Sequence, residues 1–554
     1  MYRKHSLVLS LLVILLLTTS LGVQAQEDIL TEPGELPIVT EPITLTILLR
    51  QTQNVASFED NDFTRWVEEQ TGISLEFEVA PQSESEARAK LNITLAGDDL
   101  PDIIAGMPFS AASLAQTGTN GQALPLNDLI EQYGYESKRM LEDDRPFYRS
   151  LITSPDGNIY GLPDVNECFH CFASQKMYVY GPWLDALGLE APTTTQEFKD
   201  MLIAFRDQDP NGNGEADEIP MSGAASVGWH TSVEEFLMNS FVFYQRIDVN
   251  SDRLMLDDDG MIQASYTQDG YKEGLQYMAD LYAEGLIDPN ALIQDRDQLT
   301  ALGTHEIGVE GGVNIVGAIP GGWFGQFTQV LYADEGGRAD EWFIIGPLAN
   351  DDGFRTAGYA PWGIFNYGGW VISADSEYAE AAFRLGDFLY GTEATTRNVF
   401  GELDVDWRWS NDDEVGLDGG PALYTNLSDF GDEGTNNKQW NQAAMTYRTS
   451  EYRLAQADDG NQYVEVHLLE ATRDLYVPVA PDVSQLIPPL VFGVDESRES
   501  TELKLGLDTY VDEMFVQFVT GAIPIDEAWE EYLMTLESIG LSRYLEIYQT
   551  AYDG

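Results

Sequence analysis

The sequence predicts an α/β protein built as two lobes. Strand-like and helix-like segments alternate near the N-terminus, which is typical of a parallel sheet covered by helices. The chain has 554 residues, too many for one ordinary core, so two lobes are expected. A hydrophobic content of 43% with 11 tryptophans indicates a well-packed globular chain and not a disordered one.

The alternating pattern begins at residue 43. Residues 43–49, 73–79 and 102–105 read as strands, because apolar residues alternate or run together there. Two helices are predicted between these strands, at 63–70 and 84–95, each followed by a glycine. Later strands are expected at 177–180 and 343–348, and later helices at 124–130, 183–188, 271–284 and 376–390.

The N-terminus, residues 1–25, has the form of a secretory signal peptide. Two basic residues precede the apolar stretch Leu7–Leu17, and Val23-Gln-Ala25 supplies the small residues that cleavage requires. Residues 26–41 are acidic and contain proline, and predict a flexible leader. No cysteine follows the apolar stretch directly. We therefore expect an exported protein, periplasmic or at the cell surface, without a lipid-anchoring cysteine.

Acidic residues dominate the charge of the chain. The 93 acidic residues outnumber the 29 basic residues and give a formal net charge of −64. Nucleic acid is a poor partner for such a surface, because its phosphates would be repelled. The acidity otherwise indicates solubility and does not define a fold.

Residues 209–220 predict a calcium-binding loop. Oxygen-bearing side chains, the ligands that hard cations prefer, occupy positions 1, 3, 5 and 9 of the loop at Asp209, Asn211, Asn213 and Asp217, and Glu218 is adjacent to the last of these. Gly214 occupies the position of the sharp turn in an EF-hand loop, and Glu215 the position that supplies a backbone carbonyl. The final position holds Pro220 instead of glutamate, so Glu218 would have to replace that ligand. The alternative is a solvated Asn-Gly turn.

The expected role of this ion is structural. The segment Thr194–Glu197 is a capping box, and Phe198, Met201 and Phe205 follow at helical spacing. The loop therefore begins where a buried helix ends. No candidate nucleophile lies beside it in the sequence.

Cys168 and Cys171 are the two cysteines of the chain, and His170 lies between them. In an exported protein a local disulfide is expected. A redox pair is an alternative, and so is a metal site, although a zinc ion would need two more ligands.

Tryptophans beside small residues are the candidate ligand contacts. A sugar site needs flat apolar faces and a few hydrogen-bonding groups. The candidates, chosen for their small or loop-forming neighbours, are Trp323, Trp362, Trp370, Trp407 and Arg408. The alternative for each tryptophan is an ordinary place in the core or at its rim.

Several short motifs, taken in order, resemble the extracellular solute-binding proteins of ABC importers. The motifs are Leu100-Pro-Asp-Ile103, Asp156-Gly-Asn-Ile-Tyr-Gly-Leu-Pro163, Trp183-Leu-Asp-Ala-Leu-Gly-Leu189, Pro192-Thr-Thr, Phe518-Val-Thr-Gly521, Trp529-Glu-Glu-Tyr532 and Gly540-Leu-Ser-Arg-Tyr-Leu-Glu-Ile-Tyr548. The chain is specifically similar to family 1, in the large calcium-loop branch that includes alginate-binding proteins.

This resemblance implies a two-lobed periplasmic-binding-protein fold of type II, with the ligand cleft between lobes joined by hinge crossovers. It implies a monomer that delivers a carbohydrate to a membrane permease and is not an enzyme. We expect lobe 1 at 42–170 and 310–370, and lobe 2 at 171–309 and 371–554. The crossovers are expected near Pro163–Ser174, Gly308–Gly312 and Gly368–Ser373.

Two other functions remain open at this point. A secreted, calcium-dependent glycan-processing enzyme would need two placed carboxylates, and acidic pairs are too abundant here to be informative. The Gly-x-Ser-x-Gly and His-Glu-x-x-His motifs are absent from the sequence. A peptide-binding receptor of the same fold is the second alternative.

Overall fold

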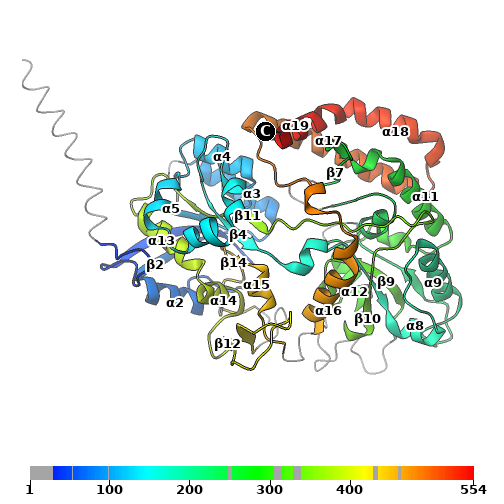
Figure 1. Cartoon of the computed structure of the whole chain (residues 1–554), viewed down its shortest axis with the longest axis horizontal. Coiled ribbons are helices and arrows are strands. Elements are labelled where there is room, and N and C mark those ends of the chain that lie inside the picture. Colours follow the sequence, from blue (N-terminus) through cyan, green and yellow to red (C-terminus); the bar gives the residue numbers. More distant parts are fainter. Residues whose placement is uncertain are drawn as a thin grey trace, which may run out of the picture.

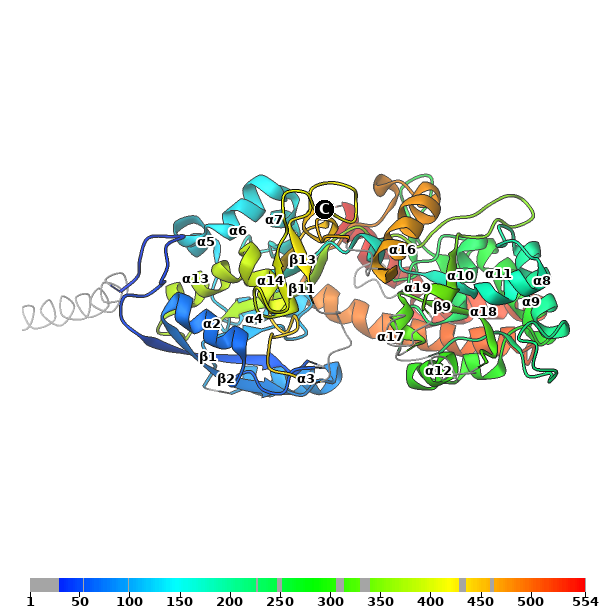
Figure 2. The ribbon, with the colours of Figure 1, turned by 90° about the horizontal axis from the view of Figure 1, so that it is seen from below.

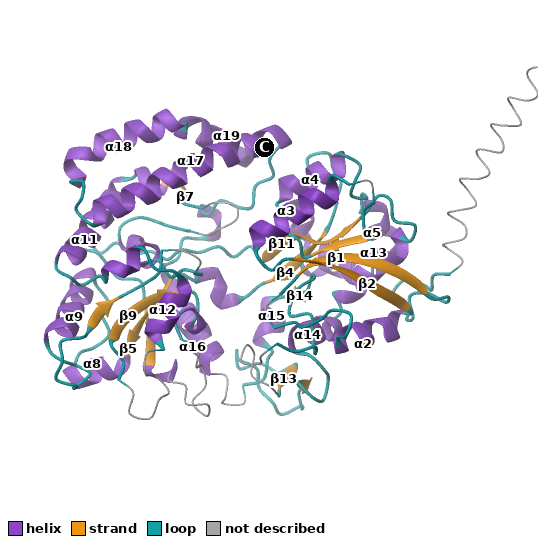
Figure 3. Ribbon diagram, turned by 180° about the vertical axis from the view of Figure 1, so that it is seen from behind, coloured by secondary structure: helices purple, strands orange, loops and turns teal. Residues whose placement is uncertain are grey.

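The computed structural model describes residues 29–52, 54–97, 99–225, 228–246, 252–304, 313–328, 339–427, 435–458 and 463–553. Two α/β lobes lie side by side along the long axis of the molecule (Figure 1). Each lobe is built around its own sheet, as Figure 3 shows. The predicted signal peptide and the predicted crossover Gly308–Gly312 lie outside the described residues. Within those residues, no helix has the length and apolarity to cross a membrane.

The first lobe contains a six-stranded sheet in the order β14-β4-β11-β3-β1-β2. Its strands are β1 (Ile43–Arg50), β2 (Ile73–Ala80), β3 (Ile103–Ala105), β4 (Leu162–Asn166), β11 (Ile364–Ile372) and β14 (Tyr447–Arg448). β1 pairs in parallel with β2 and β3, whereas β11 runs antiparallel to β3 and β4. The predicted alternation of strands and helices over 43–105 is confirmed, with α2 (Asp62–Thr71) and α3 (Glu84–Leu95) as the connections.

Burial and helix caps explain why the sequence pattern predicted the strands and helices of this region. Leu45, Ile47 and Leu49 on one face of β1 and Leu48 on the other are fully buried, as expected for a strand covered on both faces. Asn61 caps α2 through its side chain, and Gly72 ends it at a φ of 75°. The other helices of this lobe are α4 (Ala111–Thr119), α5 (Asn127–Tyr133), α6 (Glu136–Lys138), α7 (Pro146–Ile152), α13 (Ala379–Leu389) and α14 (Thr392–Phe400).

A small hairpin unit extends the first lobe toward the second. It contains β12 (Trp407–Trp409), β13 (Tyr424–Asn426) and the short helix α15 (Ser450–Leu454). Trp407, Tyr424 and Tyr452 form its buried apolar cluster. Phe400, at the end of α14, packs against this cluster and ties the unit to the lobe.

The second lobe contains a four-stranded sheet in the order β10-β5-β9-β6. The strands are β5 (Lys176–Tyr180), β6 (Ile219–Met221), β9 (Val316–Gly321) and β10 (Trp342–Ile345), with a separate hairpin of β7 (Leu254–Leu256) and β8 (Ile262–Ala264). The helices are α8 (Gly181–Leu187), α9 (Thr195–Asp207), α10 (Val233–Leu237), α11 (Asp269–Ala283), α12 (Arg296–Gly303) and α16 (Tyr463–Ala471). Val464 and Leu468 place α16 in the core of this lobe.

Three C-terminal helices complete the second lobe. They are α17 (Val494–Val519), α18 (Ile525–Ile539) and α19 (Leu541–Asp553), and their apolar residues join the second core. α17 also lies against α4 of the first lobe. In Figure 2 it reaches from the middle of the molecule into the second lobe. The C-terminal helices therefore link the two lobes besides the crossing segments of the chain.

The lobe boundaries differ from the predicted ones. β9 and β10, inside the segment 310–370 assigned to lobe 1, pair with β5 in the second sheet. Residues 371–454, assigned to lobe 2, contain α13, α14 and β14, which belong to the first lobe. The segment Gly368–Ser373 is mostly strand β11 and not a crossover. The chain passes between the lobes from β4 to β5, which confirms the predicted crossover near Pro163–Ser174, and also from β10 to β11 and between α15 and α16.

The described part of the leader, residues 29–41, is held against the first lobe. The Arg384 guanidinium, on α13, donates hydrogen bonds to the backbone carbonyls of Glu32 (2.8 Å) and Glu35 (3.0 Å). Ile38 and Val39 are buried in the first core. This corrects the prediction of a flexible leader, because the acidic composition of the segment concealed these backbone and apolar contacts.

Candidate functional site

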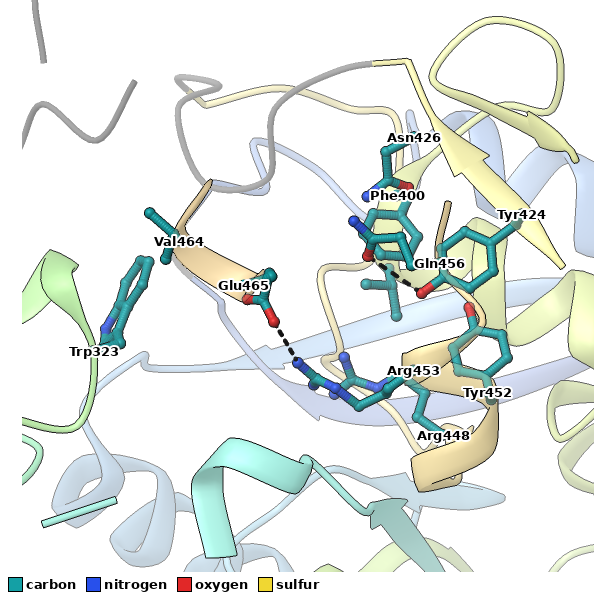
Figure 4. Close-up of a pocket in the computed structure, with 11 residues that line it drawn as sticks. Trp323, Phe400, Tyr424, Asn426, Arg448, Tyr452, Arg453, Gln456, Val464 and Glu465 are labelled. Atoms are coloured by element: carbon teal, nitrogen blue, oxygen red, sulfur yellow. Dashed lines mark hydrogen bonds and ion pairs between the residues drawn. The ribbon is translucent and has the colours of Figure 1, made fainter. Parts of the chain in front are cut away.

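A pocket of about 70 Å³ lies between the two lobes. This volume is smaller than that of most small-molecule sites, which span roughly 300–1,000 Å³. Its lining comes from both lobes and comprises Trp323, Val399, Phe400, Tyr424, Asn426, Arg448, Tyr452, Arg453, Gln456, Val464 and Glu465 (Figure 4). Trp323 follows β9, and Val464 and Glu465 begin α16, so these three belong to the second lobe. The other residues belong to α14, the hairpin unit, β14 and α15 of the first lobe.

Aromatic rings form much of the wall on the side of the first lobe. Tyr424 and Tyr452 stack with ring centroids 5.0 Å apart, and Phe400 lies 5.5 Å from Tyr424. The Tyr452 hydroxyl shares a 2.9 Å hydrogen bond with the Thr396 hydroxyl, which fixes the ring. Burial raises the pKa of Tyr452 to about 12, so its hydroxyl stays neutral at physiological pH. Trp323 lies on the opposite side of the pocket, from the second lobe (Figure 4).

Charged side chains meet at the base of the pocket. Arg453 lies 3.6 Å from the Glu465 carboxylate, and it donates a 3.1 Å hydrogen bond to Asn166. Because Arg453 and Glu465 belong to different lobes, this ion pair joins the lobes. Burial and the nearby Arg453 lower the pKa of Arg448 to about 10, which leaves Arg448 cationic at neutral pH.

His170 adds a neutral group to this cluster. Its Nδ1 lies 3.5 Å from Glu465. Burial, together with the positive charges of Arg453 and Lys176, lowers the pKa of His170 well below its usual value. Glu465 therefore faces a neutral imidazole and a charged guanidinium.

Two of the five predicted ligand residues lie in the region between the lobes. Trp323 lines the pocket. Trp362 is half-buried in the segment that crosses from β10 to β11, and it is not among the lining residues.

The structure places the other three predicted residues away from the pocket. Trp370 is 0% exposed in β11, where its indole N–H donates a 3.0 Å hydrogen bond to the Ala382 carbonyl of α13. Trp407 is also 0% exposed and donates to the Gly401 carbonyl (3.0 Å). Arg408 points away from these rings along β12 and binds the Glu414 carboxylate at 2.8 Å. None of the three lines the pocket, because each is held by its own lobe.

The sequence reasoning missed the segment that supplies most of the pocket. Residues 424–465 contribute Tyr424, Asn426, Arg448, Tyr452, Arg453, Gln456, Val464 and Glu465. One signal was present in the sequence Thr446-Tyr-Arg-Thr-Ser-Glu-Tyr-Arg453, where two arginines and two tyrosines gather in a strongly acidic chain. Aromatic and arginine side chains in a loop region are characteristic of binding sites.

The predicted calcium loop forms a compact turn between α9 and β6. The Asn211 and Asn213 side-chain amides both donate to the Asp217 carboxylate at 3.1 Å, and the Gly214 N–H donates to Asp209 at 3.1 Å. Asp209, Gly212 and Gly214 all adopt positive φ angles. The six predicted ligand residues thus lie within one turn, with Asp217 at its centre.

The charges in this loop are not balanced by the protein. No ion pair to Asp209, Glu215, Asp217 or Glu218 occurs in the part of the chain that the structure describes, and one Glu218 carboxylate oxygen is buried without a hydrogen-bond donor there. Burial and the negative charges of Asp217 and Asp209 raise the pKa of Glu218. An orphaned carboxylate beside two more acidic side chains is a donor set that fits a hard cation such as calcium.

Cys168 and Cys171 form a disulfide in the segment that crosses from β4 to β5. Their sulfurs and the His170 ring lie close together. A disulfide offers no thiolate, so this cluster does not provide the ligands of the metal alternative.

Comparison with known proteins decides the family. Residues 51–396 match the sequence profile of the bacterial extracellular solute-binding proteins. The chain belongs to this family. The predicted resemblance and the predicted two-lobed fold of a solute-binding protein are thereby confirmed.

Relatives of this solute-binding protein extend over nearly its whole length. The fructooligosaccharide ABC transporter substrate-binding protein FusA of Streptococcus pneumoniae serotype 4 is 26% identical over 495 residues, which cover 88% of this chain and 86% of that protein. The structure of S. pneumoniae FusA in complex with kestose matches with a TM-score of 0.76 at 23% identity, covering 92% of this chain and 99% of that one.

Two further structures share the fold of this solute-binding protein. An HMO-binding, ABC-transporter-associated protein from Bifidobacterium longum infantis matches with a TM-score of 0.76 at 21% identity, covering 93% of this chain and 99% of that one. A FusA variant described as an EF-hand mutant, in complex with fructo-nystose, matches with a TM-score of 0.74 at 23% identity, with coverage of 92% and 99%.

Proposed function

We propose that this solute-binding protein captures an oligosaccharide between its lobes and, as a monomer, delivers it to the membrane permease of an ABC importer. The observation that carries this proposal is the composition of the pocket. Trp323 approaches from one lobe, and the Tyr424–Tyr452 pair approaches from the other. A sugar ring has apolar faces edged by hydroxyls, which aromatic rings and polar side chains bind together. The names of FusA and the HMO-binding protein indicate oligosaccharide ligands for those relatives and support the same class here.

The pocket is suited to binding and not to hydrolysis. Glycoside hydrolysis commonly needs a pair of carboxyl groups flanking the scissile bond. Among the described lining residues the one carboxylate is Glu465, which is engaged by Arg453 and faces His170. This arrangement favours a receptor over a glycan-processing enzyme.

Capture proceeds through closure of the lobes. A ligand that touches both lobes stabilises the closed arrangement by the difference between its contacts in the two states. The three crossing segments are the hinges, and the disulfide Cys168–Cys171 lies in one of them. A short disulfide loop there limits the backbone freedom of that hinge.

The loop 209–220 holds a structural calcium ion in this proposal. The ligands are Asp209, Asn211, Asn213, Asp217 and Glu218, with the Glu215 carbonyl. The orphaned Glu218 oxygen and the absence of balancing ion pairs in the described loop support this assignment. When bound, the ion supplies positive charge that offsets these carboxylates. The side chains themselves connect the end of α9 to the start of β6.

A screen of purified protein tests the proposed ligand class. Thermal shift against panels of oligosaccharides and short peptides should show stabilisation by at least one oligosaccharide, followed by calorimetric confirmation of 1:1 binding without turnover. Stabilisation by peptides alone would overturn the proposal. Release of shortened sugars during the titration would overturn its non-enzymatic part.

A further inference from the structure

Arg448 is a buried cation without a carboxylate in contact with it. Arg448 is the last residue of β14, where it pairs with Asn166 of β4, and it is 5% exposed. One guanidinium nitrogen donates to the Gln442 side chain, and Nε has no hydrogen-bond partner in the described residues. No ion pair involves Arg448 within those residues. A buried, charged group that lacks an opposite charge is costly unless a partner arrives.

The other buried arginines of the chain are compensated. Arg253 pairs with Asp508 and Asp512. Arg384 is held by several backbone carbonyls. The chain has 93 acidic residues for 29 basic ones, so an acidic partner for Arg448 would have been easy to supply. Arg448 differs from Arg253, which has carboxylate partners, and from Arg384, whose guanidinium is held by several backbone carbonyls.

Two arginines and two acidic side chains set the charge around this part of the pocket. Asp164 acts on the charge of Arg448, but it accepts its hydrogen bonds from the Thr446 N–H (2.8 Å) and hydroxyl (2.7 Å) and forms no ion pair with Arg448. Arg453 adds a second positive charge, and Glu465 balances it from the other lobe. Figure 4 shows Arg448 and Arg453 close together, with Glu465 near Arg453. The Arg448 guanidinium therefore lines the pocket with no carboxylate in contact with it among the described residues, although Asp164 acts on its charge from a distance.

We propose that the oligosaccharide bound here is acidic and that Arg448 receives a carboxylate of one of its sugar residues. This inference rests on the proposed function and narrows its substrate class. A carboxylate places a negative charge in contact with the guanidinium and accepts charge-assisted hydrogen bonds from it, in a bidentate arrangement where two N–H groups are free. The buried Asn426 carbonyl oxygen, which also has no described partner, accepts a hydrogen bond from a sugar hydroxyl beside the aromatic rings.

Matched pairs of sugars test this inference. Calorimetry on the full chain compares oligouronides of the galacturonate, glucuronate and mannuronate types with the same oligosaccharides after methyl esterification. Sulfated neutral oligosaccharides form a third arm that separates carboxylate recognition from general anion binding. The acidic form should bind at least about tenfold more tightly than its ester, because a buried charge-assisted hydrogen bond has that magnitude.

Two variants locate the effect. Arg448→Gln should abolish the preference for the acid over the ester, since it removes the charge at the pocket. Arg65→Gln, which removes an arginine of α2 that pairs with Asp60 outside the pocket, should keep the preference. The comparison of acid and ester on the parent protein needs no variant, so a poorly folded Arg448→Gln would leave the test intact.

The outcomes separate the two proposals. Tighter binding of neutral sugars or esters than of acids, or a preference confined to the sulfated arm, overturns the inference and leaves the proposed function standing. If no oligosaccharide of any arm binds, the proposed function itself fails.

Discussion

Trp323 is the predicted ligand residue whose side chain lines the pocket in the structure. Stacking a sugar ring on an indole removes apolar area on both partners, at about 25 cal/mol per Å². Trp323→Ala should therefore weaken oligosaccharide binding about ten- to a thousandfold while the fold is kept. Calorimetry with the ligand from the screen measures the change, and circular dichroism checks the fold.

Trp409→Ala is the matched control for this experiment. Trp409 is 40% exposed on β12, packs edge-on against Trp407 with ring centroids 5.0 Å apart and does not line the pocket, so its removal should leave the affinity within about twofold. Equal binding by the parent and the Trp323→Ala variant would show that the ligand lies elsewhere.

Trp370 is expected to affect stability instead of ligand contact. Its indole fills the space between β11 and α13, close to Gly386, and its N–H is satisfied by the Ala382 carbonyl. Trp370→Ala should lower the free energy of unfolding by about 3–5 kcal/mol, the usual cost of truncating a buried aromatic residue. Urea unfolding of this variant beside Trp409→Ala measures the difference. A loss below about 1 kcal/mol would contradict the core assignment of Trp370.

At the scale of single residues, the sequence identified residue types better than their surroundings. Trp407 and Trp409 are two positions apart on β12, yet the first is fully buried and the second is 40% exposed. Trp370, although it follows two glycines, is covered by α13, which begins several residues later in the chain. Small neighbours cannot show which face of a strand a helix will cover. Only the assembled lobe determines that.

Among the elements, the loop 209–220 offers a direct test of the proposed calcium site. Chelation with EGTA should lower the melting temperature, because the ion binds the folded state and stabilises it by about 2.7 kcal/mol when free calcium is about 100 times Kd. Asp217→Ala should remove this calcium response. Asp258→Ala should keep it, since Asp258 is exposed in the acidic turn between β7 and β8. A melting temperature indifferent to calcium would contradict the calcium assignment.

The pH dependence of the calcium response follows from Glu218. Burial and the charges of Asp217 and Asp209 raise the pKa of this carboxyl above 4.5, its ordinary value. Without calcium, the charged Glu218 therefore costs stability above its raised pKa, and this cost is relieved as the pH falls through that value. Calcium needs the deprotonated form. The stabilisation by calcium should be complete well above the raised pKa and decrease as the pH falls toward 4.5, which melting curves with calcium and with EGTA can follow.

Elements with strong periodicity were predictable, and the glycine-rich strand β11 was not. The strands and helices over 43–105 follow from local patterns and end at helix caps. Residues 368–373 resembled a crossover because of Gly368 and Gly369. In the structure these glycines permit close packing, since a Cβ at Gly369 would lie 2.6 Å from the Asp164 backbone nitrogen and one at Gly368 would lie 2.3 Å from the Phe109 ring. In a single sequence, a glycine required by close packing against neighbouring residues cannot be distinguished from a glycine at a hinge.

For the whole molecule, the sequence predicted two lobes but not their boundaries. β9 completes the second sheet by inserting between β5 and β6, and β11 returns to the first sheet between β3 and β4. Both strands are apolar and could fill either sheet by pattern alone. Sheet membership depends on pairing between strands far apart in the chain, which single-sequence periodicity does not encode. The pocket segment 424–465 was not predicted for the same reason. Its residues line one pocket only because α15 and α16 face each other from opposite lobes.

The position of the pocket between the lobes predicts that ligand binding brings the lobes together. Ligand bound between Trp323 and the Tyr424–Tyr452 pair touches both lobes, so it stabilises the arrangement in which they approach. Small-angle scattering should show a smaller radius of gyration at saturating oligosaccharide than without it. The Trp323→Ala variant should reach the same final value at a higher ligand concentration, because the variant loses affinity and keeps its hinges. A radius of gyration unchanged at saturation, with binding confirmed by calorimetry, would show that the lobes hold one arrangement and that capture needs no hinge motion.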